Sequence, residues 1–123
     1  MIEVCPVKDE KVLQELFSLK GLTLTETSGA VIAKSKGETL GCCLYELDER
    51  KIIILFLEPK NDLLMADGVL RSALHVAAER SAMDAFYSEF LDEEIFKKLG
   101  FIKSSEQRRL DIDKLFGGCC QEI

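Results

Sequence analysis

Apolar residues recur at two different spacings along this chain, and the spacing changes from segment to segment. Residues 2–7 alternate apolar and polar side chains and include Pro6, which predicts a short strand near the edge of a sheet. After Asp9, a typical N-cap residue, apolar side chains return at helical spacing until Gly21. We therefore expect an amphipathic helix over this stretch.

The middle of the chain predicts an antiparallel meander that leads into a buried strand. Residues 30–33 and 40–47 have the character of strands joined by a turn at Gly37, and residues 48–50 form a second turn. Residues 51–57 are almost wholly apolar and rich in β-branched side chains. Such a run is typical of a central strand that is covered on both faces.

Helical spacing returns between Asn61 and Ser81, where small and apolar side chains form one stripe. Residues 84–87 predict a short strand, Asp92 is placed to cap a further helix, and Gly100 ends that helix before a strand that starts at Phe101. Strand–helix–strand crossovers place their two strands in parallel, so residues 52–57 and 84–87 should run side by side. The predicted class is α/β, with a mixed, mostly antiparallel sheet and helices on both faces.

Composition and charge narrow the class of protein. The chain has 123 residues, of which 47% are hydrophobic, so we expect a single domain over residues 1–116 and a flexible C-terminal tail over residues 117–123. A net charge of −6 without any block of Lys or Arg argues against a nucleic-acid partner. No apolar run is long enough to span a membrane and no signal peptide opens the chain, so we expect no membrane partner and a cytoplasmic location.

The five cysteines and the single histidine do not form a recognisable ligand set. We expect Cys5, Cys42 and Cys43 to be core or sheet residues with free thiols, in a protein of a reducing compartment. Cys119 and Cys120 follow two glycines and fit either a frayed terminus or a thiol pair that binds a soft metal or reacts with oxidants. His75 has no second ligand at metal-binding spacing, so we expect a surface residue and no metal.

The order of these elements, with the helix end Phe96-Lys97-Lys98-Leu99-Gly100-Phe101, resembles the GNAT acetyltransferases. Leu99-Gly100-Phe101 matches the Leu-Gly-Phe that closes the corresponding helix in that family, and a glycine C-cap between core residues accounts for it. The resemblance extends from Ile2 to about Ile112. It implies the GNAT acyl-CoA N-acyltransferase fold.

The resemblance also implies a cosubstrate, acetyl-CoA or another acyl-CoA, held where the two parallel strands separate. Its pantetheine would bond to strand backbone at Phe56 and Leu57, and its pyrophosphate would lie at the N-terminus of the following helix. The small positions of the family's phosphate loop align with Ala66 and Gly68, and Arg71 would add positive charge. Leu63 stands where the family has Arg or Gln, and Asp67 is expected within the loop. A helix simply capped by Asn61 or Asp62 is the alternative for this segment.

For catalysis, the resemblance directs attention to two side chains. Glu58, at the end of the buried strand, is the candidate base that frees an attacking amine of its proton. The family's tyrosine proton donor aligns with Phe96, so Tyr87 is the candidate acid, with Tyr45 as the remaining phenol. The implied function is transfer of an acyl group to an amine of a small molecule or a protein. The alternative is a catalytically inactive ligand-sensing or protein-interaction module, as a monomer or a homodimer.

Overall fold

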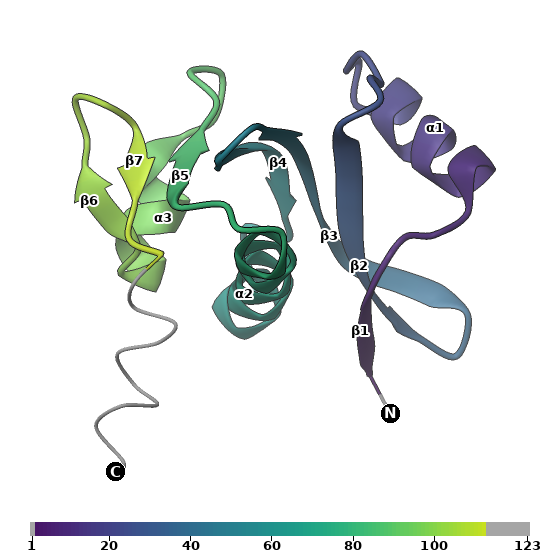
Figure 1. Cartoon of the computed structure of the whole chain (residues 1–123). Coiled ribbons are helices and arrows are strands. Elements are labelled where there is room, and N and C mark those ends of the chain that lie inside the picture. The colour runs from purple at the N-terminus through teal and green to yellow at the C-terminus, as the bar shows by residue number, and fades with distance from the viewer. Residues whose placement is uncertain (1, 113–123) are drawn as a thin grey trace, which may run out of the picture.

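The computed structural model describes residues 2–112 and contains one seven-stranded sheet with three helices (Figure 1). Along the chain the elements are β1 (Glu3–Pro6), α1 (Glu10–Leu19), β2 (Ser28–Ser35), β3 (Glu38–Asp48), β4 (Lys51–Glu58), α2 (Leu63–Glu79), β5 (Asp84–Tyr87), α3 (Glu93–Leu99), β6 (Ile102–Ser104) and β7 (Arg109–Leu110). The strands lie in the order β1-β2-β3-β4-β5-β7-β6, and only β4 and β5 pair in parallel. The predicted mixed, mostly antiparallel sheet is confirmed.

The helix boundaries follow local capping chemistry. The Asp9 carboxylate accepts the Lys11 N–H at 2.9 Å and starts α1, and Asp92 does the same for α3. Gly100 adopts a left-handed conformation with φ of 76° at the end of α3, where the Phe101 N–H donates to the Phe96 carbonyl at 3.0 Å. The predicted caps at both ends of α3 are therefore confirmed.

Helices cover both faces of the sheet, as predicted. The larger core packs α2 and α3 against one face, where the buried side chains of Ile52, Ile54 and Tyr87 lie. The smaller core joins Phe17 of α1 to Ala30 and Leu44 on the opposite face. Figure 1 shows the sheet running between α1 and α2.

β4 and β5 stop pairing after Ile54, where β5 ends and β4 has a bulge. Their parallel register ends at the pair Ile54–Tyr87, and the Ser88 N–H makes the last bond to the Ile54 carbonyl at 2.8 Å. Tyr45 of β3 pairs with Ile54 while Leu44 pairs with Phe56, so Leu55 is the extra residue of a β-bulge. β4 therefore continues past β5, and the bulge places both Leu55 and Phe56 against the α1 core.

The structure differs from the sequence expectations at β7 and at Asp67. β7 was not predicted, although its two residues separate β5 from β6 in the sheet. Asp67 does not lie in a loop, because α2 begins at Leu63 directly after its cap, Asp62. Cys119, Cys120 and the expected tail over residues 117–123 lie outside the described residues.

Burial agrees with the expectations for the thiols and the histidine in the described part. Cys42 and Cys43 are buried in β3, Cys5 is half-buried in β1, and His75 is exposed on α2. Within residues 2–112, no helix is both long and apolar enough to cross a membrane.

Candidate functional site

The end of β4 offers an open strand edge. Over residues 55–58, the side of β4 that faces β5 has no strand partner among residues 2–112. On its other side, β4 lies so close to β3 that a Cβ on Gly41 would come within 2.9 Å of the Glu58 carbonyl oxygen and of the Pro59 ring. Glycine at position 41 therefore lets the end of β4 stay close to β3 after β5 has ended.

Glu58 projects from this strand end onto the face that α1 covers. Its Oε1 lies 3.3 Å from Lys20 Nζ and accepts a long hydrogen bond of 3.5 Å from the Cys42 thiol. Lys20 also lies over the Phe56 ring, 4.6 Å from its centroid. Burial, and then the Glu58 carboxylate, raise the pKa of Cys42 to about 12, so this thiol stays protonated at neutral pH.

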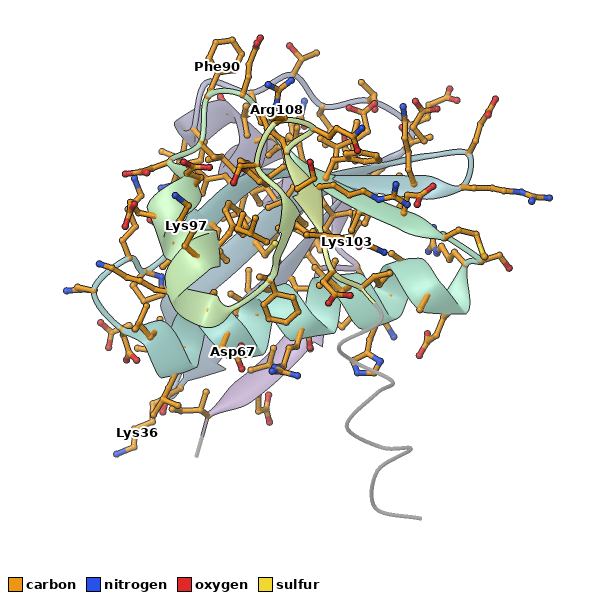
Figure 2. The ribbon with its side chains drawn as sticks, turned by 90° about the vertical axis from the view of Figure 1, so that its left-hand side faces the viewer. Lys36, Asp67, Phe90, Lys97, Lys103 and Arg108 are labelled. Carbon is orange, nitrogen blue, oxygen red and sulfur yellow. The ribbon has the colours of Figure 1, made fainter. Side chains whose placement is uncertain are left out.

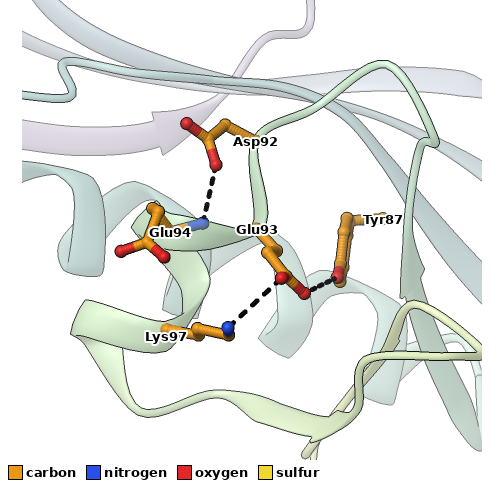
Figure 3. Close-up of polar contacts among 5 residues, drawn as sticks. All are labelled: Tyr87, Asp92, Glu93, Glu94 and Lys97. Carbon is orange, nitrogen blue, oxygen red and sulfur yellow. Dashed lines mark hydrogen bonds and ion pairs between the residues drawn. The ribbon is translucent and has the colours of Figure 1, made fainter.

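Tyr87 lies on the opposite face, in the core between the sheet and α3 (Figure 3). Its ring stacks on Phe96 with centroids 4.6 Å apart, and its hydroxyl donates to Glu93 Oε2 at 3.4 Å. Glu93 in turn pairs with Lys97 at 3.2 Å. Burial, and then the Glu93 carboxylate, raise the pKa of Tyr87, so its phenol carries a proton across the neutral range.

The two predicted catalytic side chains do not meet each other. Tyr87 pairs in register with Ile54, four residues before Glu58, a separation of about 13 Å along a strand. The side chains also project from opposite faces, Tyr87 into the larger core and Glu58 toward α1. They therefore flank the open edge of β4 from its two sides.

The N-terminus of α2 is largely used by its own cap. Asp62 Oδ1 accepts the Met65 N–H at 3.2 Å, and its carbonyl accepts the Ala66 N–H at 3.0 Å. The first two N–H groups, those of Leu63 and Leu64, are the ones that an external acceptor would find. Gly68 lies beyond this first turn, with nothing within 4 Å of an added Cβ.

The positive charges near this helix start are partly neutralised. Arg71 Nε donates to Asp67 Oδ2 at 2.7 Å, one helical turn earlier, and the guanidinium lies over the Phe101 ring. Lys60 lines a small cavity of about 110 Å³ between the end of β4 and α3, together with Lys98, Asp92 and Glu94. Two lysines and two carboxylates thus share that space.

A larger pocket lies beside the bulge, and it was not predicted. It has a volume of about 380 Å³, and we call it the β4–β5 pocket. Its floor is Ile53, Leu55 and Phe86, and its rim carries Phe90 and Arg108, which Figure 2 shows at the same end of the molecule. In the sequence this face is hidden, because β4 is apolar on both sides and nothing there tells which side a helix leaves open. Ten residues line the pocket: Lys51, Ile53, Leu55, Phe86, Tyr87, Ser88, Glu89, Phe90, Gln107 and Arg108.

The described chain has no cluster of metal-ligating side chains. Within residues 2–112 no three His, Cys, Asp or Glu side chains are grouped so that they could hold an ion.

Comparison with known proteins identifies the fold. No protein-family model and no curated protein sequence matches the chain, but solved structures do. It is similar to a GNAT family acetyltransferase from Streptococcus pneumoniae, with a TM-score of 0.56 at 16% identity over 83% of this chain and 88% of that one. An aminoglycoside N-acetyltransferase solved with CoA superimposes with a TM-score of 0.62 at 10% identity, over 85% and 90% of the two chains.

A third structure, an aminoglycoside acetyltransferase from an uncultured soil metagenomic sample, was solved with sisomicin. It gives a TM-score of 0.58 at 11% identity over 81% of this chain and 84% of that one. The chain therefore has the GNAT acetyltransferase fold, and the resemblance inferred from its sequence is confirmed at the level of the fold.

Proposed function

We propose that this protein binds acetyl-CoA or another acyl-CoA along the open edge of β4 and transfers the acyl group to an amine. The observation that carries this proposal is the strand edge over residues 55–58, beside the end of β5. An unpaired edge presents N–H and C=O groups at fixed spacing, and the amides of a pantetheine arm can bond to them as an added strand does. Phe56 and Leu57 would supply that backbone. A neighbour of the same fold solved with CoA supports the choice of ligand.

The reaction assigns one role to each face of the sheet. The amine nitrogen attacks the thioester carbon, so that a C–N bond forms and the C–S bond breaks. Glu58 takes the amine proton through a water. Its Oε1 contacts Lys20 and Cys42, so its Oε2 is the oxygen that would accept the proton. Tyr87 gives its proton to the departing thiolate from the other face, and its raised pKa means that the phenol is protonated at neutral pH before the transfer.

The nucleotide end of the donor would be held weakly. The predicted phosphate residues Ala66 and Gly68 lie within α2, and Arg71 is paired with Asp67. The Asp62 carboxylate also stands at the helix start, where it opposes an incoming pyrophosphate. We therefore propose that the pantetheine arm supplies most of the affinity.

Comparing two donors tests this proposal. Acetyl-CoA and S-acetyl-pantetheine, which lacks the nucleotide, should bind with dissociation constants within about tenfold of each other, a difference of about 1.4 kcal/mol. Release of free thiol in the presence of an amine panel then reports transfer. Binding of acetyl-CoA with no measurable binding of S-acetyl-pantetheine would contradict the proposal that the strand edge binds the pantetheine arm.

Three features favour a second candidate, a catalytically inactive module for ligand sensing or protein interaction. Phe96 has no hydroxyl, Asp62 covers the start of α2, and Leu64 is 87% exposed beside Leu63. These leucines line an open groove of about 790 Å³ with Ile2, which would suit an apolar protein surface or a second copy of the chain. Heat from acetyl-CoA without thiol release would select this candidate, and sedimentation velocity would identify a homodimer.

A further inference from the structure

We infer that the β4–β5 pocket takes a small amine that carries an apolar body and one carboxylate, as an apolar amino acid does, and not a polycationic amine. This inference rests on the proposed function, because it names the acceptor of that reaction. The floor of the pocket, its charges and its position beside the bulge support it.

The floor of the pocket is apolar, and Ile53 and Phe86 in it belong to neither of the two buried cores. Ile53 and Phe86 project to the face opposite α2 and are half-buried, whereas their neighbours Ile52 and Ala85 are fully buried beneath α2. Phe90 stands at the rim with 88% of its surface exposed. An apolar floor with a nearby aromatic side chain favours a ligand with an apolar or aromatic body.

The charges on the lining differ in sign from those of the whole chain. Lys51 and Arg108 line the pocket together with a single carboxylate, Glu89, although the net charge of the protein is −6. Lys51 has a long ion pair of 3.8 Å with Asp48, and Arg108 makes no ion pair with any described residue.

This set of charges fits a ligand with one group of each sign. A ligand carboxylate pairs with Arg108 or Lys51, and Glu89 can hold an ammonium. A ligand with several ammonium groups would meet Arg108, Lys51 with its distant partner Asp48, and only one carboxylate on the lining itself. The lining therefore disfavours polycationic acceptors such as aminoglycosides.

The pocket opens toward the place where the donor is proposed to react. Leu55, the bulge residue, belongs to the pocket floor and begins the open edge of β4, and Ser88 makes the last bond between the two parallel strands. An amine held over this floor is thus adjacent to a thioester on residues 55–57. The volume of about 380 Å³ is near the lower end of the ~300–1,000 Å³ typical of small-molecule sites.

Donor-free binding of three probes tests the inference. L-phenylalanine, L-phenylalaninamide and sisomicin are titrated into the full chain, and chemical-shift changes or heats give the affinities. The amide keeps the ring and the amine but lacks the carboxylate. We expect L-phenylalanine to bind about fivefold more tightly than the amide, as for a partly exposed ion pair, and sisomicin to bind most weakly.

Charge variants test whether Arg108 causes the preference for L-phenylalanine over the amide. Arg108→Glu should remove or reverse the preference for L-phenylalanine over the amide, and Arg108→Gln should reduce it. Lys11→Glu, an equal charge change on exposed α1, should leave it intact. A thermal unfolding curve checks that each variant is folded.

Equal affinities for the first two probes, tightest binding of sisomicin, or no binding of any probe at millimolar concentration would overturn the inference. Because no donor is present, this result is independent of the proposed transferase activity. Binding of L-phenylalanine with no binding of acetyl-CoA would leave the pocket assignment standing and remove the transferase.

Discussion

At the scale of single residues, two glycines differ in how much room their surroundings leave for a side chain. A Cβ on Gly29 would lie 2.6 Å from the Tyr45 ring, whereas one on Gly68 has nothing within 4 Å. Gly29→Ala should lower the free energy of unfolding by about 1–3 kcal/mol through overpacking. Gly68→Ala should raise it by up to about 1 kcal/mol, because alanine favours a helix interior. Urea unfolding measures both, and equal effects of the two changes would contradict the packing described for Tyr45.

Tyr87 is the residue whose proposed chemistry is easiest to isolate. Tyr87→Phe keeps the ring on Phe96 but removes the proton, and should lower kcat about 100-fold with little change in KM. Tyr45→Phe, in the same core, is the matched control and should retain the wild-type rate. Because the pKa of Tyr87 is raised above its usual value, the wild-type rate should not fall with Tyr87 ionisation below about pH 10. A Tyr87→Phe enzyme with normal kcat would remove Tyr87 from the reaction.

Some residue environments could be foreseen from the sequence, and others could not. Burial of Cys42 and Cys43 follows from their place in a strand of the meander. The contacts of Glu58 with Lys20 and Cys42 join three elements that are distant in the chain, so no local pattern encodes them. Glu58 was identified by its position at a strand end, and its partners needed the structure.

At the scale of elements, the start of α2 decides how the donor is held. Asp62→Ala removes the cap and should cost about 0.5–2 kcal/mol of stability. The same change frees the Met65 N–H and removes a negative charge beside the proposed pyrophosphate, so acetyl-CoA should bind several-fold more tightly. Calorimetry at a temperature where the variant is folded measures this.

The control for this variant is Asp9→Ala, which removes an equivalent cap from α1. It should cost similar stability and leave the affinity for acetyl-CoA unchanged. If both variants leave that affinity unaltered, the donor does not place its phosphates at the start of α2.

Elements with their own capping or turn signals were predictable. Asp9, Asp92 and Gly100 mark helix ends through local hydrogen bonds, and the structure confirms all three. β7 has only two residues and depends on pairing with β5 and β6, so its sequence carries no periodic pattern. The bulge at Leu55 was equally hidden, because one extra apolar residue in an apolar strand leaves no trace in the pattern.

At the scale of the whole molecule, buried thiols and phenols should make the stability of the fold decrease at alkaline pH. Burial raises the pKa of Cys42, Cys43, Tyr45 and Tyr87 above their values in an unfolded chain. The stability linked to these groups is complete below the unfolded values and is lost as pH rises, starting near pH 9 for the cysteines, because the unfolded state releases protons first.

Denaturation at a series of pH values measures this loss. Each fully titrating group contributes a slope of about −1.4 kcal/mol per pH unit. Cys42→Ala should make the slope between pH 9 and the folded value of about 12 shallower by one such contribution. Cys5→Ala, at a half-buried thiol, is the control. An unchanged slope in Cys42→Ala would show that this thiol is not protected from ionisation.

The overall architecture was predictable because the order of elements and the crossover rule restrict how the sheet can be arranged. The β4–α2–β5 unit fixes the parallel pair, and the meander fixes its neighbours. The β4–β5 pocket was not predictable, since it forms where β4, the Ser88–Phe90 loop and the turn at Arg108 come together. Such a site depends on which part of a sheet face the helices leave uncovered.

The central claim is that the open edge of β4 binds an acyl-CoA. Isothermal titration of acetyl-CoA into the full chain, with a thermal unfolding curve at the same concentrations, tests it most directly. We predict heat that saturates at one ligand per chain and an unfolding temperature that rises with acetyl-CoA concentration. No heat and no thermal shift at millimolar acetyl-CoA would contradict the account.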